Sequence, residues 1–119
     1  MAQISDYEAI VKALNLYVLG CNEGKSEIMK PAFAEGAVMY GTDKDGSTVG
    51  GSIENLFKGI DASGKTNAKA HIDVLHVSGT IAIARVIMEG WHGLTFTDLH
   101  QLFKSNGEWK IIAKAYHTH

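Results

Sequence analysis

The sequence predicts an α+β fold in which three N-terminal helices pack on a curved antiparallel sheet. Apolar residues recur at helical spacing in the first half of the chain, and four later segments have the composition and alternation of strands. The turns between these segments are short, which makes neighbouring strands antiparallel. With 119 residues the chain has the usual size of one domain, so we expect a single domain over residues 1–119.

The first helix is predicted from its apolar face. Residues at three- and four-residue spacing form this face: Ile10, Val11, Leu14, Val18 and Cys21. Ser5 and Glu8 have the spacing of a capping box, and Gly24 suits the left-handed conformation that ends a helix. A second, shorter helix is expected after Ser26, bent or shortened by Pro31. It would present Ile28, Met29, Ala32 and Phe33.

A small hairpin and a third helix follow. Residues 37–40 and 48–49 are predicted to be short strands on either side of a turn at 43–46. Ser52 is then placed to cap the third helix. Its apolar residues are Ile53, Leu56, Phe57 and Ile60.

The rest of the chain predicts four longer strands, over residues 70–78, 81–92, 94–104 and 108–117. The second of them is apolar on both faces. One face carries Ile81, Ile83, Arg85, Ile87, Glu89 and Trp91, and the other carries Ala82, Ala84, Val86 and Met88. Both faces must be covered, and the helices can cover one. We therefore expect a homodimer through the sheet; a closed barrel or a covering loop is the alternative.

Composition excludes several classes of partner. The net charge is −2 and Lys and Arg form no run, which argues against nucleic acid. The N-terminus lacks the pattern of a signal peptide, and no apolar run approaches the roughly 20 residues that cross a bilayer. Cys21 is the single cysteine and cannot form an internal disulfide. We expect a cytoplasmic protein without a membrane partner.

Residues spread along the whole chain resemble those of a known superfamily. In the last strands they are Phe96-Thr97-Asp98, Leu102-Phe103-Lys104, Asn106-Gly107-Glu108-Trp109-Lys110-Ile111-Ile112 and Lys114; upstream they are Tyr17, Asn22-Glu23-Gly24, Phe33-Ala34 and Met39-Tyr40-Gly41-Thr42-Asp43. The pattern resembles nuclear transport factor 2-like domains, most closely the bacterial group named putative lumazine-binding, which is similar to the SnoaL-like polyketide cyclases. The resemblance implies a cone: a curved sheet wrapped against the first helix, with an open-ended pocket between them. Many members have His-Pro-Asp-Ala where this chain has Ala34-Glu35-Gly36-Ala37.

The resemblance favours a small-molecule-binding domain of the SnoaL-like type, with its pocket between the first helix and the sheet, an unknown ligand, and neither cofactor nor metal. The alternative is a cofactor-free isomerase, cyclase or hydrolase that acts on a small hydrophobic or aromatic substrate. A protein–protein adaptor is a third class. No exposed aromatic or charged stripe for a peptide is apparent in the sequence.

The ketosteroid isomerases of this superfamily need a carboxylate base and two donors to the enolate oxygen. By resemblance Tyr17 stands where that family has its phenolic donor. Gly41 stands in place of the base and Leu99 in place of the second donor acid. Because two of the three groups are absent, the isomerase mechanism is disfavoured.

Four residues remain candidates for catalysis: Tyr17, Arg85, Asp98 and His100. Arg85 lies between apolar residues and is costly to bury unless Asp98 or Glu89 pairs with it. Such a pair could polarise a carbonyl or position a water, as limonene epoxide hydrolases do on a similar cone. A structural ion pair at the sheet surface or dimer seam is the favoured alternative. Tyr17 could equally be a packed core residue, and His100 a general base or a residue of the dimer seam.

Aromatic residues are the candidates for the walls of the pocket: Tyr40, Phe57, Trp91 and Phe96. They could stack on a flat ligand ring, and the alternative for each is core packing. No metal site is expected. None of the six histidines occurs in a metal-binding spacing on a helix. Asp43 and Asp45 begin like a calcium loop, but Thr48 stands where that loop requires glycine.

Overall fold

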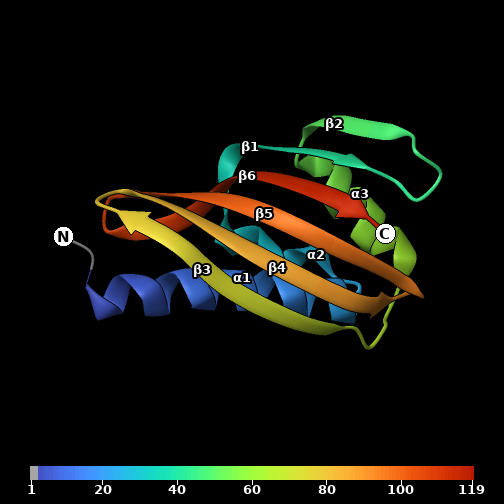
Figure 1. Cartoon of the computed structure of the whole chain (residues 1–119), viewed down its shortest axis with the longest axis horizontal. Coiled ribbons are helices and arrows are strands. Elements are labelled where there is room, and N and C mark those ends of the chain that lie inside the picture. Colours follow the sequence, from blue (N-terminus) through green and yellow to red (C-terminus); the bar gives the residue numbers. More distant parts are fainter. Residues whose placement is uncertain (1–2) are drawn as a thin grey trace.

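A six-stranded sheet, in the order β2-β1-β6-β5-β4-β3, organises the computed structural model, which describes residues 3–119. The elements along the chain are α1 (Ile4–Glu23), α2 (Ser26–Met29), the 3₁₀ turn η1 (Lys30–Ala32), β1 (Phe33–Thr42), β2 (Thr48–Ser52), α3 (Glu54–Ser63), β3 (Lys69–Ser78), β4 (Ile81–Trp91), β5 (Leu94–Ser105) and β6 (Glu108–Thr118). Figure 1 shows α1 running along one face of the sheet, with α3 near the C-terminal end of β6. The predicted order of helices and strands is confirmed.

The start of α1 differs from the prediction. Ser5 and Glu8 lie inside the helix, and the carboxylate of Asp6 accepts the N–H of Gln3 at 3.0 Å. The same carboxylate accepts the Lys104 ammonium at 2.9 Å and the Trp109 indole N–H at 3.0 Å. Asp6 therefore joins the first turn of α1 to the β5–β6 hairpin and closes that end of the molecule.

The segment after α1 is shorter in helix and longer in strand than predicted. Gly24 ends α1 in the left-handed conformation, with φ 67°, as expected. The second helix ends at Met29 and continues as the turn that contains Pro31, whose missing N–H is tolerated in a first turn. Phe33 is not part of that helix; it begins β1, four residues before the predicted start at residue 37.

Pairing within the sheet is antiparallel with one exception. β1 runs parallel to β6, which places the first strand beside the last one. The four longer strands pair sequentially through short turns, as predicted. Parallel pairing over a long stretch of sequence leaves no local pattern, so the sequence did not indicate it.

Extra residues interrupt the alternation of β3, β4 and β6. Ile112 interrupts β6, because Leu102 pairs with Ile111 whereas Gln101 pairs with Ala113. Gly90, with φ 79°, shifts the register of β4, and β3 has a similar irregularity between Val74 and His76. Such bulges bend a strand and move every later side chain to the other face.

The core lies between α1 and the inner face of the sheet. Ile10 and Leu14 of α1 are fully buried, and Leu102 and Ile111 meet them from β5 and β6. In the part of the chain that the structure describes, no helix has the length and apolar character needed to cross a membrane.

Candidate functional site

A cavity of about 330 Å³ lies where the C-terminal half of α1, α3 and the ends of β4, β5 and β6 meet. Its walls are largely apolar: Met39, Leu56, Ile60, Met88, Trp91, Leu94 and Phe96. The polar groups that reach it include Tyr17, Asp43, Lys114, Tyr116 and Thr118. An apolar cavity with a few placed polar groups is the usual form of a small-molecule site.

Tyr17, Asp98 and His100 form a buried polar cluster behind the cavity wall. Tyr17 lies in the C-terminal half of α1, and its phenol donates a hydrogen bond of 2.7 Å to Asp98 Oδ2. His100 Nε2 lies 3.5 Å from the same oxygen without hydrogen-bond geometry. Within residues 3–119, Asp98 Oδ1 and both ring nitrogens of His100 have no hydrogen-bond partner. Asp98 and His100 are inward neighbours on β5, but of the three side chains Tyr17 is the one that lines the cavity.

Burial and neighbouring charges fix the protonation states in this cluster. Burial raises the pKa of Tyr17 well above its ordinary value, and the Asp98 carboxylate raises it further. Burial also acts to raise the pKa of Asp98, but the Lys114 ammonium, His100 and the Tyr17 phenol lower it by more, so that its pKa lies below the ordinary value. Burial lowers the pKa of His100. At neutral pH the cluster thus contains a neutral phenol, a carboxylate and a neutral imidazole.

Lys114 projects from β6 into the cavity wall and is 5% exposed. Its ammonium lies 4.5 Å from the ring centroid of Tyr116 and 5.5 Å from that of Tyr17, so two aromatic faces stabilise the charge. Among the described residues its hydrogen-bond acceptor is the Met39 sulfur, at 3.7 Å. A thioether is a weak acceptor, which leaves the donors of this ammonium largely unused.

Asp43 and Tyr116 form the second polar pair of the cavity. The Tyr116 phenol donates to Asp43 Oδ1 at 2.9 Å, and both side chains line the cavity. Burial and the Asp43 carboxylate raise the pKa of Tyr116 to about 12. The ring of Tyr116 occupies the space that a Cβ at Gly41 would need. The place that the isomerase resemblance assigns to a base is therefore filled by a tyrosine ring, and a carboxylate lies two residues further on.

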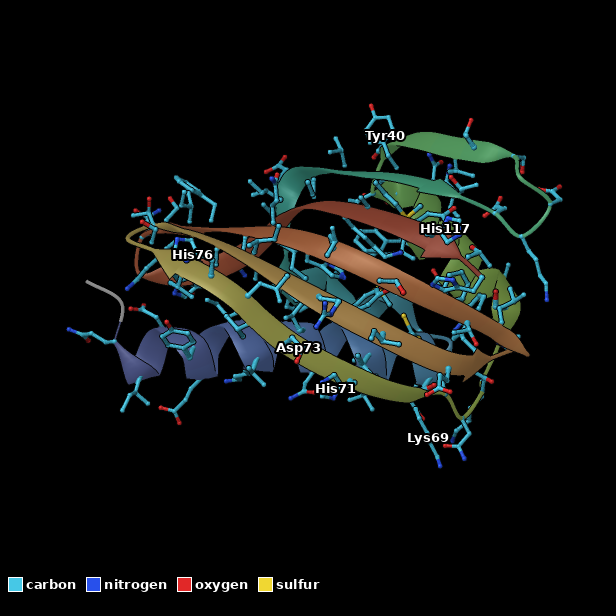
Figure 2. All side chains as sticks on the ribbon, viewed as in Figure 1. Tyr40, Lys69, His71, Asp73, His76 and His117 are labelled. Carbon is cyan, nitrogen blue, oxygen red and sulfur yellow. The ribbon has the colours of Figure 1, made fainter. Side chains whose placement is uncertain are left out.

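Two of the four aromatic candidates line the cavity. Trp91 and Phe96 stand in its wall, 5.7 Å apart between ring centroids, and the Trp91 indole donates to the Cys21 carbonyl at 3.0 Å. The expected wall positions of Phe57 and Tyr40 are wrong. Phe57 packs edge-to-face on Phe33 in the core, and Tyr40 is 58% exposed at the β1–β2 edge and points away from the molecule (Figure 2).

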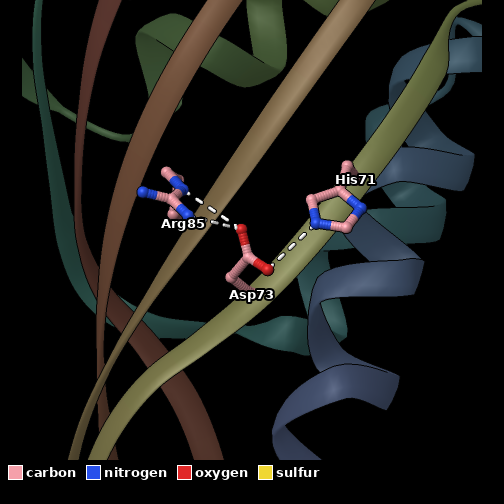
Figure 3. Close-up of polar contacts among 3 residues, drawn as sticks. All are labelled: His71, Asp73 and Arg85. Carbon is pink, nitrogen blue, oxygen red and sulfur yellow. Dashed lines mark hydrogen bonds and ion pairs between the residues drawn. The ribbon is translucent and has the colours of Figure 1, made fainter.

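Arg85 does not join the buried cluster. Alternation along β4 puts it on the outer face of the sheet, whereas Asp98 points inward from β5. Its expected partners are therefore wrong: Arg85 pairs across the strands with Asp73 at 2.8 Å, and Asp73 also contacts His71 at 2.9 Å (Figure 3). The Arg85 side chain is 42% exposed, in keeping with the surface ion pair weighed as the alternative.

Sequence reasoning missed Asp43, Lys114 and Tyr116 as members of one site. Strict alternation from Trp109 and Ile111 places even-numbered residues of β6 outside, and the bulge at Ile112 reverses this. For Asp43, the sequence indicates a turn and a family motif, and the one site that it suggests there is a calcium loop. Within residues 3–119, no group of three or more His, Cys, Asp or Glu side chains is placed to hold a metal ion.

The Tyr17–Asp98 hydrogen bond gives a prediction on stability. We expect Tyr17→Phe to lower the free energy of unfolding by about 1–3 kcal/mol, because it leaves a buried carboxylate without its donor. Denaturant unfolding measures this, with Tyr7→Phe at an exposed tyrosine of the same helix as the control. Equal stability of the two variants would show that the hydrogen bond contributes nothing.

Comparisons with known proteins agree with this architecture. The model of the family described as "Putative lumazine-binding" matches residues 5–117. The chain is 34% identical over 117 residues to Aldolase FrzH from a Cladobotryum species, covering 97% of this chain and 93% of that protein.

Solved structures superpose over almost the whole chain. A nuclear transport factor 2-like protein of unknown function from Shewanella baltica has 38% identity and a TM-score of 0.93, covering 100% of this chain and 98% of that one. One from Methylobacillus flagellatus has 32% identity and the same TM-score, 0.93, covering 99% and 95%. A ketosteroid isomerase-like protein from Erwinia carotovora atroseptica, 16% identical with a TM-score of 0.73 over 98% of both chains, shares the fold. The chain therefore belongs to the putative lumazine-binding family of nuclear transport factor 2-like proteins.

Proposed function

We propose that this chain binds a small, largely apolar organic molecule in the cavity between α1, α3 and the sheet. The observation that carries the proposal is the cavity itself, with about 330 Å³ of space and apolar or aromatic residues over most of its wall. Trp91 and Phe96 offer ring surfaces on which a flat guest can stack. The description of the family as lumazine-binding supports a ligand of this kind.

A variant that fills the cavity tests the binding proposal. The probe is α-tetralone, a two-ring ketone small enough for the cavity. We expect it to raise the melting temperature of the wild type and to give a saturable titration in calorimetry. Leu94→Trp places a larger side chain in the wall and should abolish both effects.

The matched control is Leu19→Trp, at an exposed leucine on α1 that lies outside the cavity wall. This variant should bind α-tetralone like the wild type. Undiminished binding by Leu94→Trp would show that the probe binds elsewhere, and the cavity would lose its proposed role.

A second candidate function is cofactor-free chemistry at the carbon next to a carbonyl group. The relative named an aldolase supports it, together with the carboxylate of Asp43 in the cavity wall. In such a reaction the proton leaves the α-carbon for the Asp43 carboxylate, and the C–H electron pair forms the C=C bond of an enolate. The Tyr116 phenol holds this carboxylate in place from β6. Tyr17, whose phenol donates a hydrogen bond to Asp98, lines the same space.

Proton exchange tests this second candidate. We expect the wild type to accelerate exchange of the α-hydrogens of α-tetralone in D₂O, followed by proton NMR. Asp43→Asn keeps an acceptor for Tyr116 but removes the base, so the protein-dependent rate should fall by about 10²-fold or more. Asp45→Asn, an exposed carboxylate in the same turn, is the control and should exchange at the wild-type rate. Exchange no faster than in buffer with the wild type would reject the enzyme candidate and leave the binding proposal standing.

We further propose that the outer face of the sheet joins two copies of the chain. This face, which points away from α1, carries exposed apolar side chains on neighbouring strands: Leu75, Ile81, Leu99, Phe103 and Ile112, between 36% and 56% exposed. Apolar residues gathered on one face usually mark an association surface, and a two-fold dimer is the commonest solution.

Sedimentation measures the assembly directly. We expect the wild type at micromolar concentration to have twice the mass of one chain, and the double variant Leu99→Glu/Phe103→Glu to have the mass of one chain. Leu19→Glu, on the opposite side of the molecule, should stay dimeric. A monomeric wild type would contradict the dimer proposal.

A further inference from the structure

The ammonium of Lys114 is an unusual group to find in an apolar wall. It is 5% exposed, and among the described residues its one hydrogen-bond acceptor is a sulfur atom. A buried ammonium has three N–H donors and normally meets oxygen acceptors, because each donor left unused carries a desolvation cost. The two tyrosine rings stabilise its charge but accept no conventional hydrogen bond. The space in front of Lys114 is the cavity.

We propose that Lys114 binds the carbonyl oxygen of a neutral ketone or aldehyde in the cavity. The inference rests on the proposed binding function and names the chemical class of the ligand. The thioether of Met39 is then the local substitute for that oxygen when the cavity holds no guest. The hydroxyl of Thr118, which lines the same cavity and has no hydrogen-bond partner within residues 3–119, is a second group that the ligand can engage.

Charge balance selects a neutral ligand over an anion. The interior already contains a charge opposite to that of Lys114: Asp98 is 1% exposed, and the Lys114 ammonium is near enough to lower its pKa. A carboxylate guest would add a third buried charge with no counter-ion, because the cation beside it is already compensated. The cavity wall also contains one further charged residue of each sign, Lys44 and Asp43. A carbonyl oxygen satisfies the ammonium and leaves this balance unchanged.

A carbonyl group also explains the combination of one cation with aromatic and aliphatic walls. A hydrocarbon guest would fill the apolar space but leave the ammonium without an oxygen. A polyol would need several acceptors and donors, whereas the wall is formed mostly by residues such as Met88, Leu94 and Phe96. A single oxygen on an apolar frame matches both parts of the wall.

The test compares α-tetralone with tetralin, the hydrocarbon of the same shape, and with tetralin carboxylate. We expect wild-type protein to bind α-tetralone about tenfold more tightly than tetralin, the effect of one hydrogen bond to a charged group. The carboxylate should bind more weakly than the ketone. Lys114→Met, which keeps the length of the side chain, should bind α-tetralone and tetralin equally. Lys58→Met, at an exposed lysine of α3 that lies outside the cavity wall, should keep the wild-type preference.

The carbonyl stretching frequency of bound α-tetralone gives a readout that needs no variant. We expect it to fall below its value in a hydrocarbon solvent, because a hydrogen bond from an ammonium weakens the C=O bond, and to recover in Lys114→Met.

Equal binding of the ketone and the hydrocarbon by the wild type, or an unshifted carbonyl band, would overturn the role of Lys114 and leave the cavity proposal intact. Failure of the wild type to bind either probe would overturn the binding proposal and this inference together.

Discussion

One extra residue in the last strand determines the chemistry of the interior. Before Ile112, the inward side chains of β6 are Trp109 and Ile111, and both pack in the core. After Ile112, Lys114, Tyr116 and Thr118 turn inward, where strict alternation would have placed Ala113 and Ala115. A single strand thus contributes to the closed core at one end of the molecule and to the polar part of a cavity at the other.

The same effect marks the limit of what the sequence could predict. Helical spacing and short turns were sufficient for the order of the elements and for the last four strands, because these signals are local. Side-chain direction beyond a bulge is not local: strict alternation along β4 puts Trp91 on the same face as Arg85, and the bulge at Gly90 turns it into the cavity wall instead. A glycine such as Gly90 inside a strand can indicate a bulge, whereas an isoleucine such as Ile112 does not. The error over Arg85 has a different source, since pairing it with Asp98 required a strand register that the sequence does not contain.

By resemblance to ketosteroid isomerases, Gly41 stands where those enzymes have a carboxylate base, and the structure explains why no carboxylate fits there. Gly41 has no side chain because the ring of Tyr116, its partner on β6, occupies that space. The phenol of that ring reaches past the end of β1 and holds Asp43. The carboxylate in the cavity wall therefore comes from residue 43 rather than residue 41, and Tyr116 lines the cavity beside it. The absence of an acid at residue 41 consequently says little about whether the cavity contains one.

Asp98 and Lys114 carry opposite buried charges, and because they do not touch, the N–H donors of Lys114 remain free to bind a ligand. Among the described residues the two groups form no direct salt bridge: Asp98 accepts the Tyr17 phenol, and the ring of Tyr17 faces the Lys114 ammonium. A direct contact would use the N–H donors of the lysine and withdraw them from the cavity. The opposite charges still attract through the low-dielectric interior, where the Lys114 ammonium lowers the pKa of Asp98, and this attraction offsets part of the cost of burial. The hydrogen bonds of Lys114 stay available because its charge is compensated at a distance, and an ammonium of this kind can bind a neutral oxygen without first breaking an ion pair.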